Sequence, residues 1–161
     1  MNKITFILAL IGSLGTAYSV IMTFYWHRVS IDCSIAEYCP TKDALVVYMS
    51  FTNYSRLPIS ITNISIWNDC ILYSCVHTPE VVKVVSRTHG NEEVYNHPIF
   101  SSPLPINIPS LSGTSGYVYF LFPQENWKAD TKFLTVELST NRHLTLRMKL
   151  SLEKSLRIAQ S

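Results

Sequence analysis

The residues best suited to chemistry in this chain are its four cysteines and the histidines near them. Cys33 and Cys39 are separated by five residues, and Cys70 and Cys75 by four. A thiol beside a histidine can bind a soft metal ion, or the histidine can activate the thiol as a nucleophile. The next three histidines after the second pair are His77, His89 and His97. Cys70, Cys75 and His77 therefore form the candidate region for thiol-redox or metal chemistry.

The same spacing also fits structural disulfides. Four cysteines allow three pairings, and the sequence does not choose among them. The two local bridges, Cys33–Cys39 and Cys70–Cys75, are the simplest, and they would place the domain in an oxidising compartment. Zinc is an alternative, although only the second pair has the spacing of a zinc knuckle, and free structural thiols are a third. We predict two disulfides, no metal and no cofactor.

Other catalytic signatures are missing from the sequence. It has no G-x-S-x-G or H-E-x-x-H motif, no P-loop and no dinucleotide fingerprint. The only adjacent carboxylates, Glu92 and Glu93, lie in a polar stretch typical of a solvated loop. The net charge is +2, and no basic run alternates with aromatic residues, so a nucleic-acid partner is not expected. We predict a non-enzymatic protein with no catalytic residues.

The N-terminal segment predicts a membrane anchor. Residues Ile4 to Trp26 carry no charged side chain, and at about 1.5 Å per residue their helix would cross the ~30 Å hydrocarbon core of a bilayer. A cleavable signal peptide ending at Ala17 is the alternative. However, the apolar run continues to an aromatic cluster, Phe24–Trp26, followed by Arg28, which is typical of a bilayer interface. We predict an uncleaved signal-anchor with a single transmembrane helix.

Small residues in this helix also permit a weak self-association. They recur at helical spacing: Ala9, Gly12, Ser13, Thr16 and Ala17. Such residues let two helices approach closely in lipid, although they are also common in membrane helices generally. The predicted partners of this helix are thus the lipid bilayer and, more weakly, a second copy of the helix.

The side of the membrane on which the domain lies is less clearly encoded. Lys3 precedes the helix, whereas Arg28 and Lys42 follow it, which leans slightly toward a cytoplasmic domain. The low charged fraction, 15% against about 25% in soluble domains, and the cysteines favour the opposite side. We predict an extracytoplasmic domain on the cell membrane. The sequons at Asn53 and Asn63 matter only in a eukaryotic secretory pathway.

After the anchor, the hydrophobic pattern is that of β-strands. Residues 44–53 alternate, with one apolar face formed by Leu45, Val47, Met49 and Phe51. In the next strand Ile59 and Ile61 have one phase and Ile64 and Ile66 the other, so we predict a β-bulge at Thr62–Asn63 that turns all four inward.

The remaining segments predict a sheet-rich domain with one irregular crossover. Val81–Val85 is a short strand and His89–Pro98 a polar loop, while the prolines of Phe100–Gly116 indicate an edge or crossover segment. Tyr117–Phe122 is apolar on both faces. A hairpin joins 133–139 to 143–152, and a final helical turn is placed at 153–160.

Together these strands predict an all-β fold, a two-sheet Ig-like sandwich behind a single N-terminal transmembrane helix. The expected boundaries are an anchor at 1–28, a linker at 29–43 and the sandwich at 44–161. Three stretches, Phe51–Ile61, Leu104–Pro109 and Gly116–Tyr117, resemble small, uncharacterised, membrane-anchored β-sandwich proteins of Gram-positive bacteria and their mobile elements. The resemblance implies a fold and a bacterial setting, and no activity.

Two functions follow as hypotheses. The first is a binding or interaction module with a protein partner of unknown identity. Its candidate surface is the doubly apolar strand, represented by Tyr117, Tyr119, Phe120 and Phe122. The alternative is an envelope thiol-redox or metal-binding protein that uses the Cys70, Cys75 and His77 region. The basic stretch 142–157 could also rest on anionic lipid headgroups, or simply protect a sheet edge.

Overall fold

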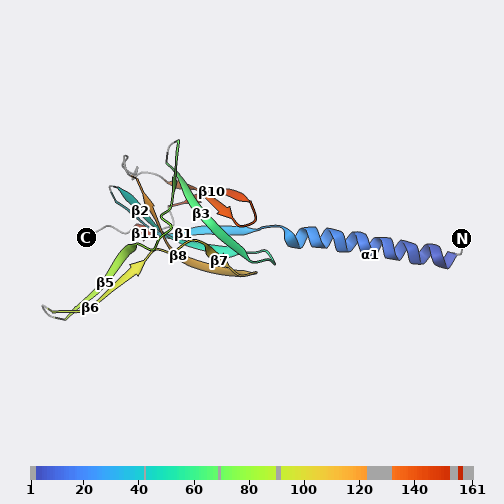
Figure 1. The fold of residues 1–161 in the computed structure, drawn as a ribbon, viewed down its shortest axis with the longest axis horizontal. Helices are drawn as coiled ribbons and strands as arrows, with labels where there is room; N and C mark the ends of the chain where they lie inside the picture. The colour runs from blue at the N-terminus through green and yellow to red at the C-terminus, as the bar shows by residue number, and fades with distance from the viewer. Residues whose placement is uncertain are drawn as a thin grey trace.

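A long N-terminal helix projects from a body built of β-strands (Figure 1). The computed structural model describes residues 3–41, 43–68, 70–89, 92–122, 132–152 and 156–157. The elements are α1 (Lys3–His27), β1 (Ile31–Pro40), β2 (Ala44–Asn53), β3 (Ile59–Asn68), β4 (Ile71–Ser74), β5 (Val81–His89), β6 (Glu92–Phe100), β7 (Ile106–Ile108), β8 (Ser112–Leu121), β9 (Phe133–Thr140), β10 (Thr145–Ser151) and β11 (Leu156–Arg157).

The helix α1 is long and apolar enough to span a membrane. Its stretch Ile4–Tyr25 has a mean hydropathy of 1.9, and none of it is buried against the β-body. Three of its hydroxyl groups are satisfied within the helix: Ser13 and Thr16 donate hydrogen bonds of 2.9 Å to the carbonyls of Leu10 and Gly12, and Thr23 donates one of 2.8 Å to the carbonyl of Ser19. A helix in lipid needs this internal pairing, since no water is present to supply it.

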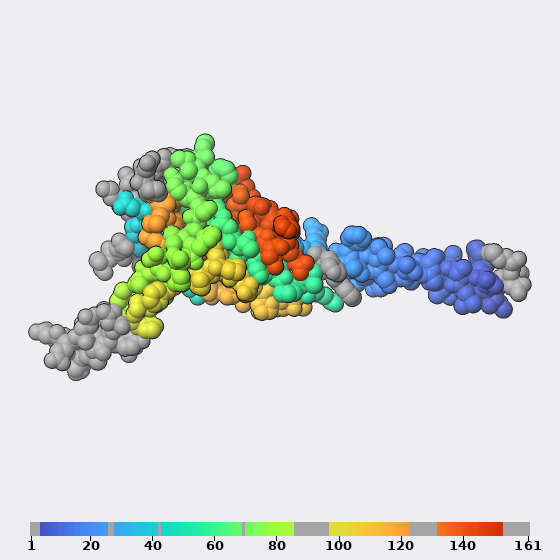
Figure 2. All heavy atoms as spheres, viewed as in Figure 1, coloured from blue at the N-terminus to red at the C-terminus, as the bar shows by residue number. Residues whose placement is uncertain are grey.

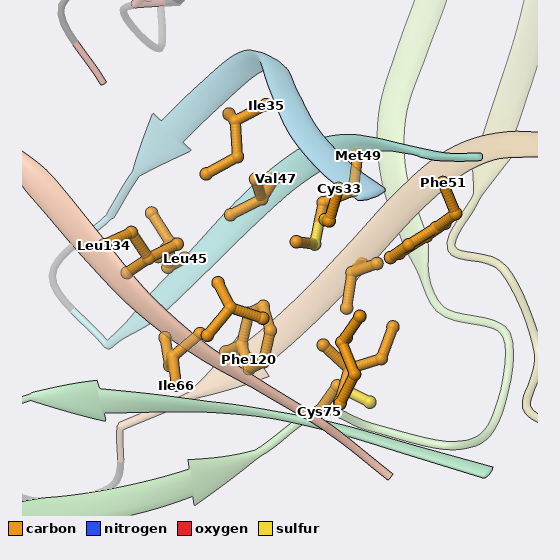
Figure 3. Packing of buried hydrophobic residues seen from close by; sticks show 14 of the residues in the cluster. Cys33, Ile35, Leu45, Val47, Met49, Phe51, Ile66, Cys75, Phe120 and Leu134 are labelled. Atoms are coloured by element: carbon orange, nitrogen blue, oxygen red, sulfur yellow. The ribbon is translucent and has the colours of Figure 1, made fainter. Parts of the chain in front are cut away.

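Two sheets enclose one hydrophobic core. The first has the strand order β11-β1-β2-β8, and the second has the order β10-β9-β3-β4, with β7 also paired to β3. All of these pairings are antiparallel except that of β1 with β11. Buried side chains from both sheets meet between them (Figure 3). The structure is therefore mostly β behind one apolar helix, as the sequence predicts.

The predicted alternation of β2 and the bulge in β3 are confirmed. On β2 the four predicted inward residues are at most 1% exposed. On β3 the pairing with β9 shifts between Ile61 and Asn63, and Thr62 is the exposed extra residue. Ile59, Ile61, Ile64 and Ile66 are each at most 1% exposed. The bulge therefore keeps both halves of the strand facing one core.

The predicted linker at 29–43 is wrong, because β1 occupies most of it. Cys33 and Ile35 point into the core, and a register shift between Ile35 and Glu37 then reverses the alternation. This second bulge obscured the strand in the sequence pattern. As a result, only residues 28–30 connect α1 to the first strand of the sheet.

The predicted polar loop at 89–98 is also wrong. Residues 92–100 form β6, which pairs with β5 in a separate two-stranded sheet that points away from the body on the side opposite α1 (Figures 1 and 2). Because this hairpin does not join either of the larger sheets, its sequence lacks the alternation of a strand with one buried face.

The crossover and the C-terminal region complete the sheets. The predicted edge segment contains β7, beside β3, and β8 starts at Ser112. The hairpin of β9 and β10 is confirmed. The predicted final helical turn is wrong at 156–157, where β11 pairs with β1; the rest of 153–160 lies outside the described residues.

The side chain of Asn53 joins the turns at the end of the body that faces α1. It is fully buried, and its amide nitrogen donates to the carbonyls of Leu57 at 2.8 Å and Pro109 at 3.0 Å. Its oxygen accepts hydrogen bonds from the backbone N–H and the hydroxyl of Ser55, at 2.9 and 2.6 Å. The amide of this sequon is therefore inaccessible in the folded protein.

Replacing an inward isoleucine tests the bulge. We predict that Ile64→Ala lowers the free energy of unfolding by about 2–5 kcal/mol, because it leaves a cavity in a fully buried site. Urea unfolding of the full chain in detergent, followed by circular dichroism, measures this change. The control is Thr62→Ala at the exposed bulge, which should cost less than about 1 kcal/mol. A near-neutral Ile64→Ala would contradict the inward orientation.

Candidate functional site

The structure contains no disulfide, so the two predicted bridges are wrong. All four cysteines are free. Cys33 and Cys39 lie six residues apart on one extended strand, a separation of roughly 20 Å at about 3.3 Å per residue. Cys70 and Cys75 flank β4 and are separated by roughly 16 Å on the same basis. Disulfide-bonded cysteines need Cα atoms closer than about 7 Å.

Two of the thiols are core residues. Cys33 and Cys75 are 4% and 5% exposed and belong to the hydrophobic cluster between the sheets (Figure 3). Burial, together with the charge of Asp32, raises the pKa of Cys33 to about 12, and burial also raises the pKa of Cys75. Both remain protonated at neutral pH and behave as small apolar side chains.

The residues of the thiol and metal hypothesis are not brought together. Cys70 lies exposed before β4, whereas the Cys75 side chain is buried after it. His77 is exposed, with Nε2 3.3 Å from Oδ1 of Asn63. His97 is exposed on β6, and the side chain of His89 lies outside the described residues. Within the part of the chain that the structure describes, no three His, Cys, Asp or Glu residues form a group that could hold a metal ion.

Half of the predicted interaction surface is core. Phe120 and Phe122 are 0% and 1% exposed, so their assignment to a surface is wrong. Phe120 points between the sheets from β8 (Figure 3), and the ring of Phe122 packs edge-on against Tyr73 with centroids 4.8 Å apart. The sequence Tyr117–Phe122 is apolar on both faces because the outward face of β8 carries tyrosines.

Those tyrosines form a fixed row on the outer face of the first sheet. Tyr117 packs edge-on against Tyr48 with ring centroids 4.8 Å apart, and its hydroxyl donates to Glu37 at 3.2 Å. The bulge in β1 places Glu37 there, opposite Tyr48. Partial burial and the Glu37 charge raise the pKa of Tyr117. Tyr119 is also half-buried and lies two residues further along β8, where it pairs with Val46 of β2. This face is a partly covered aromatic surface.

Several exposed apolar side chains of the β-body lie on the β5–β6 hairpin. Four of the hairpin's described apolar side chains are 38–52% exposed: Val81, Val84, Val85 and Phe100. The hairpin is attached where Val76 and Ser102 bond to the carbonyls of Tyr119 and Tyr117, at 2.8 and 2.7 Å. Beyond that attachment it extends away from the core (Figure 2). The sequence missed this surface because β6 reads as polar.

Comparison of the chain with protein-family models and with curated proteins finds no match. The assignment of function therefore depends on the arrangement of these surfaces.

Thiol reactivity tests the cysteine environments. In the native protein without reductant, we predict that a maleimide modifies Cys70 fast, Cys39 more slowly, and Cys33 and Cys75 only after unfolding. The physical reason is burial, which blocks access and keeps the core thiols protonated. Peptide mass spectrometry after timed labelling measures the order. Recovery of any Cys–Cys linked peptide from denatured, unreduced protein would contradict it.

Proposed function

We propose that this protein is a single-pass, membrane-anchored, non-enzymatic interaction module. Its body is an Ig-like two-sheet sandwich that the helix α1 presents at the cell membrane. The observation that carries the proposal is the wholly exposed apolar helix, which ends three residues before the first strand of the body. Such a helix is unfavourable in water and stable in a bilayer. The use of Ig-like sandwiches as interaction modules is an analogy at the level of the fold.

The partner-binding surface in this proposal is the β5–β6 hairpin. A two-stranded hairpin alone is marginally stable in water, and this one leaves a cluster of valines and Phe100 exposed. It also lies at the end of the molecule opposite α1, where a protein partner can approach without meeting the membrane (Figure 1). Tyr117 and Tyr119 are weaker candidates because each is already half-buried.

The domain is placed outside the cytoplasm in this proposal. With no disulfide in the structure, the low charged fraction of the chain is the remaining support for this side. Labelling of the exposed Cys70 in intact cells with a membrane-impermeant maleimide tests it. Protection of Cys70 until the cells are lysed would place the domain in the cytoplasm.

Alkaline extraction tests the anchor. We predict that the full-length protein stays in the membrane fraction after carbonate washing, because α1 is buried in lipid. Immunoblotting and N-terminal sequencing provide the measurement. A soluble product that starts near Tyr18 would show instead that the segment is a cleaved signal peptide.

Polar substitution on the hairpin tests the partner surface. We predict that Val81→Thr combined with Val84→Thr lowers the yield of an in-membrane crosslinked complex at least about fivefold, since it removes exposed apolar contacts. The melting temperature should change little, because both side chains are about half exposed. The matched control is Ile71→Thr with Leu72→Thr on β4, also exposed. Equal loss of the complex in both variants would contradict the assignment to the hairpin.

A further inference from the structure

The end of the β-body that faces α1 is built from three turns. Strand register places them together, because Asn53 at the end of β2 pairs with both Ile31 and Ser112. In the second sheet, Ile59 pairs with Ile108, and Ile61 pairs with Thr140. The turns are residues 54–58, 109–111 and 141–144, and we call this surface the helix-facing end.

Charge on the helix-facing end is of one sign. The three turns and the connection 28–30 contain Arg28, Arg56, Arg142 and His143, and they contain no carboxylate. All three arginines are exposed. The nearest acidic residue along the chain is Asp32, whose side chain accepts a hydrogen bond from the backbone N–H of Cys33 at 2.9 Å. This surface therefore attracts anions.

Apolar and aromatic side chains project from the same surface. Tyr54 is 60% exposed and Leu111 is 68% exposed. Leu111 is also held at a φ of 51°, in the left-handed region, by a 3.1 Å hydrogen bond from its N–H to the carbonyl of Ser55. A leucine fixed in this conformation and directed into solvent is costly for the folded protein. Exposed tyrosine and leucine beside arginine are typical of a surface that meets a bilayer interface.

A cleft of about 480 Å³ lies between the turns 54–58 and 109–111 and the end of α1. Its walls include Tyr25, Arg28, Tyr54, Arg56 and Leu111. The hydrogen bond from the N–H of Tyr54 to the carbonyl of Ser30, at 2.8 Å, fixes the connection against the turn. Two guanidinium groups in one cleft are suited to a phosphate group, which arginine can bind through two parallel hydrogen bonds.

The short connection sets the position of this surface relative to a bilayer. Three residues span about 10 Å at most, so a membrane that holds α1 must lie against the helix-facing end. We infer that this end docks on the phosphate headgroups of anionic phospholipids. Arg28 and Arg56 bind a headgroup in the cleft, Arg142 contacts the headgroup layer, and Tyr54 and Leu111 enter the interface. The inference rests on the proposed membrane anchor.

Other basic residues serve as a contrast. Arg147 lies over the ring of Trp67 at 4.5 Å, and Lys149 lies over Phe133 at 4.7 Å, both on the outer face of the second sheet. The described part of the basic stretch 142–157 is therefore not one surface: Arg142 and His143 belong to the helix-facing end, whereas Arg147 and Lys149 do not. Arg147→Gln with Lys149→Gln makes a control of equal charge loss for two arginines of the docking surface.

The experiment uses the full chain in nanodiscs with an environment-sensitive dye at Leu111→Cys, in a background with Cys39→Ser and Cys70→Ser so that no other accessible thiol is labelled. We expect the emission of the dye to report less polar surroundings in nanodiscs that contain phosphatidylglycerol than in nanodiscs of phosphatidylcholine alone. Arg28→Gln with Arg56→Gln should lower the docked-to-undocked ratio about fivefold per arginine, whereas the control pair should not change it. High salt should reverse the shift.

The outcomes separate the inference from the proposed function. Failure of the protein to incorporate into nanodiscs would overturn the membrane anchor itself. Incorporation with a dye response that is the same in both lipids, or equal loss in the control pair, would overturn the docking surface while leaving the anchor intact.

Discussion

The buried amide of Asn53 is the contact on which the arrangement of the helix-facing end depends. It binds carbonyls from two different turns and accepts two hydrogen bonds from Ser55, so all of its polar atoms are paired without water. The next residue, Tyr54, then bonds to Ser30 in the connection from α1. One buried polar side chain thus links the turn 54–58 to the turn 109–111 and, through its neighbour Tyr54, to the connection from α1. A hydrophobic residue of the same size would leave those carbonyls unpaired, at a cost of about 1–3 kcal/mol each.

The parts of the fold that could be predicted are those in which one strand has one continuous buried face. For β2 the alternation is unbroken, and for β3 the phase slip itself indicated the bulge that the pairing with β9 contains. For β1 the bulge between Ile35 and Glu37 interrupts the alternation of buried and exposed residues. One of its inward residues is also a cysteine, so the sequence shows no continuous apolar face. For β6 no pattern existed to be found, since its pairing partner β5 supplies hydrogen bonds but no core.

The candidate site is harder to predict because residues that are close in sequence need not be close in space. Cys70 and Cys75 are near neighbours in the chain, but the strand between them is extended and puts one outside and one in the core. Phe120 and Tyr119 are adjacent and face opposite sides of β8. By contrast, the pairing of Glu37 with Tyr117 and the clustering of Arg28 with Arg56 join residues far apart in sequence. Only the order of strands in the sheets brings them together.

The two ends of the molecule differ in how firmly the core supports them. The helix-facing end is tied by Asn53 and by strand pairs that run directly into both sheets, so the turns that carry Arg56 and Arg142 are anchored to the core. The β5–β6 hairpin at the opposite end is joined to the body at its base and contributes none of its described side chains to the core cluster. Covering it changes little in the interior, because its described side chains take no part in the core packing. A rigid end toward the membrane and a weakly supported apolar end away from it suit a protein that holds its position in lipid while a partner binds at the far end.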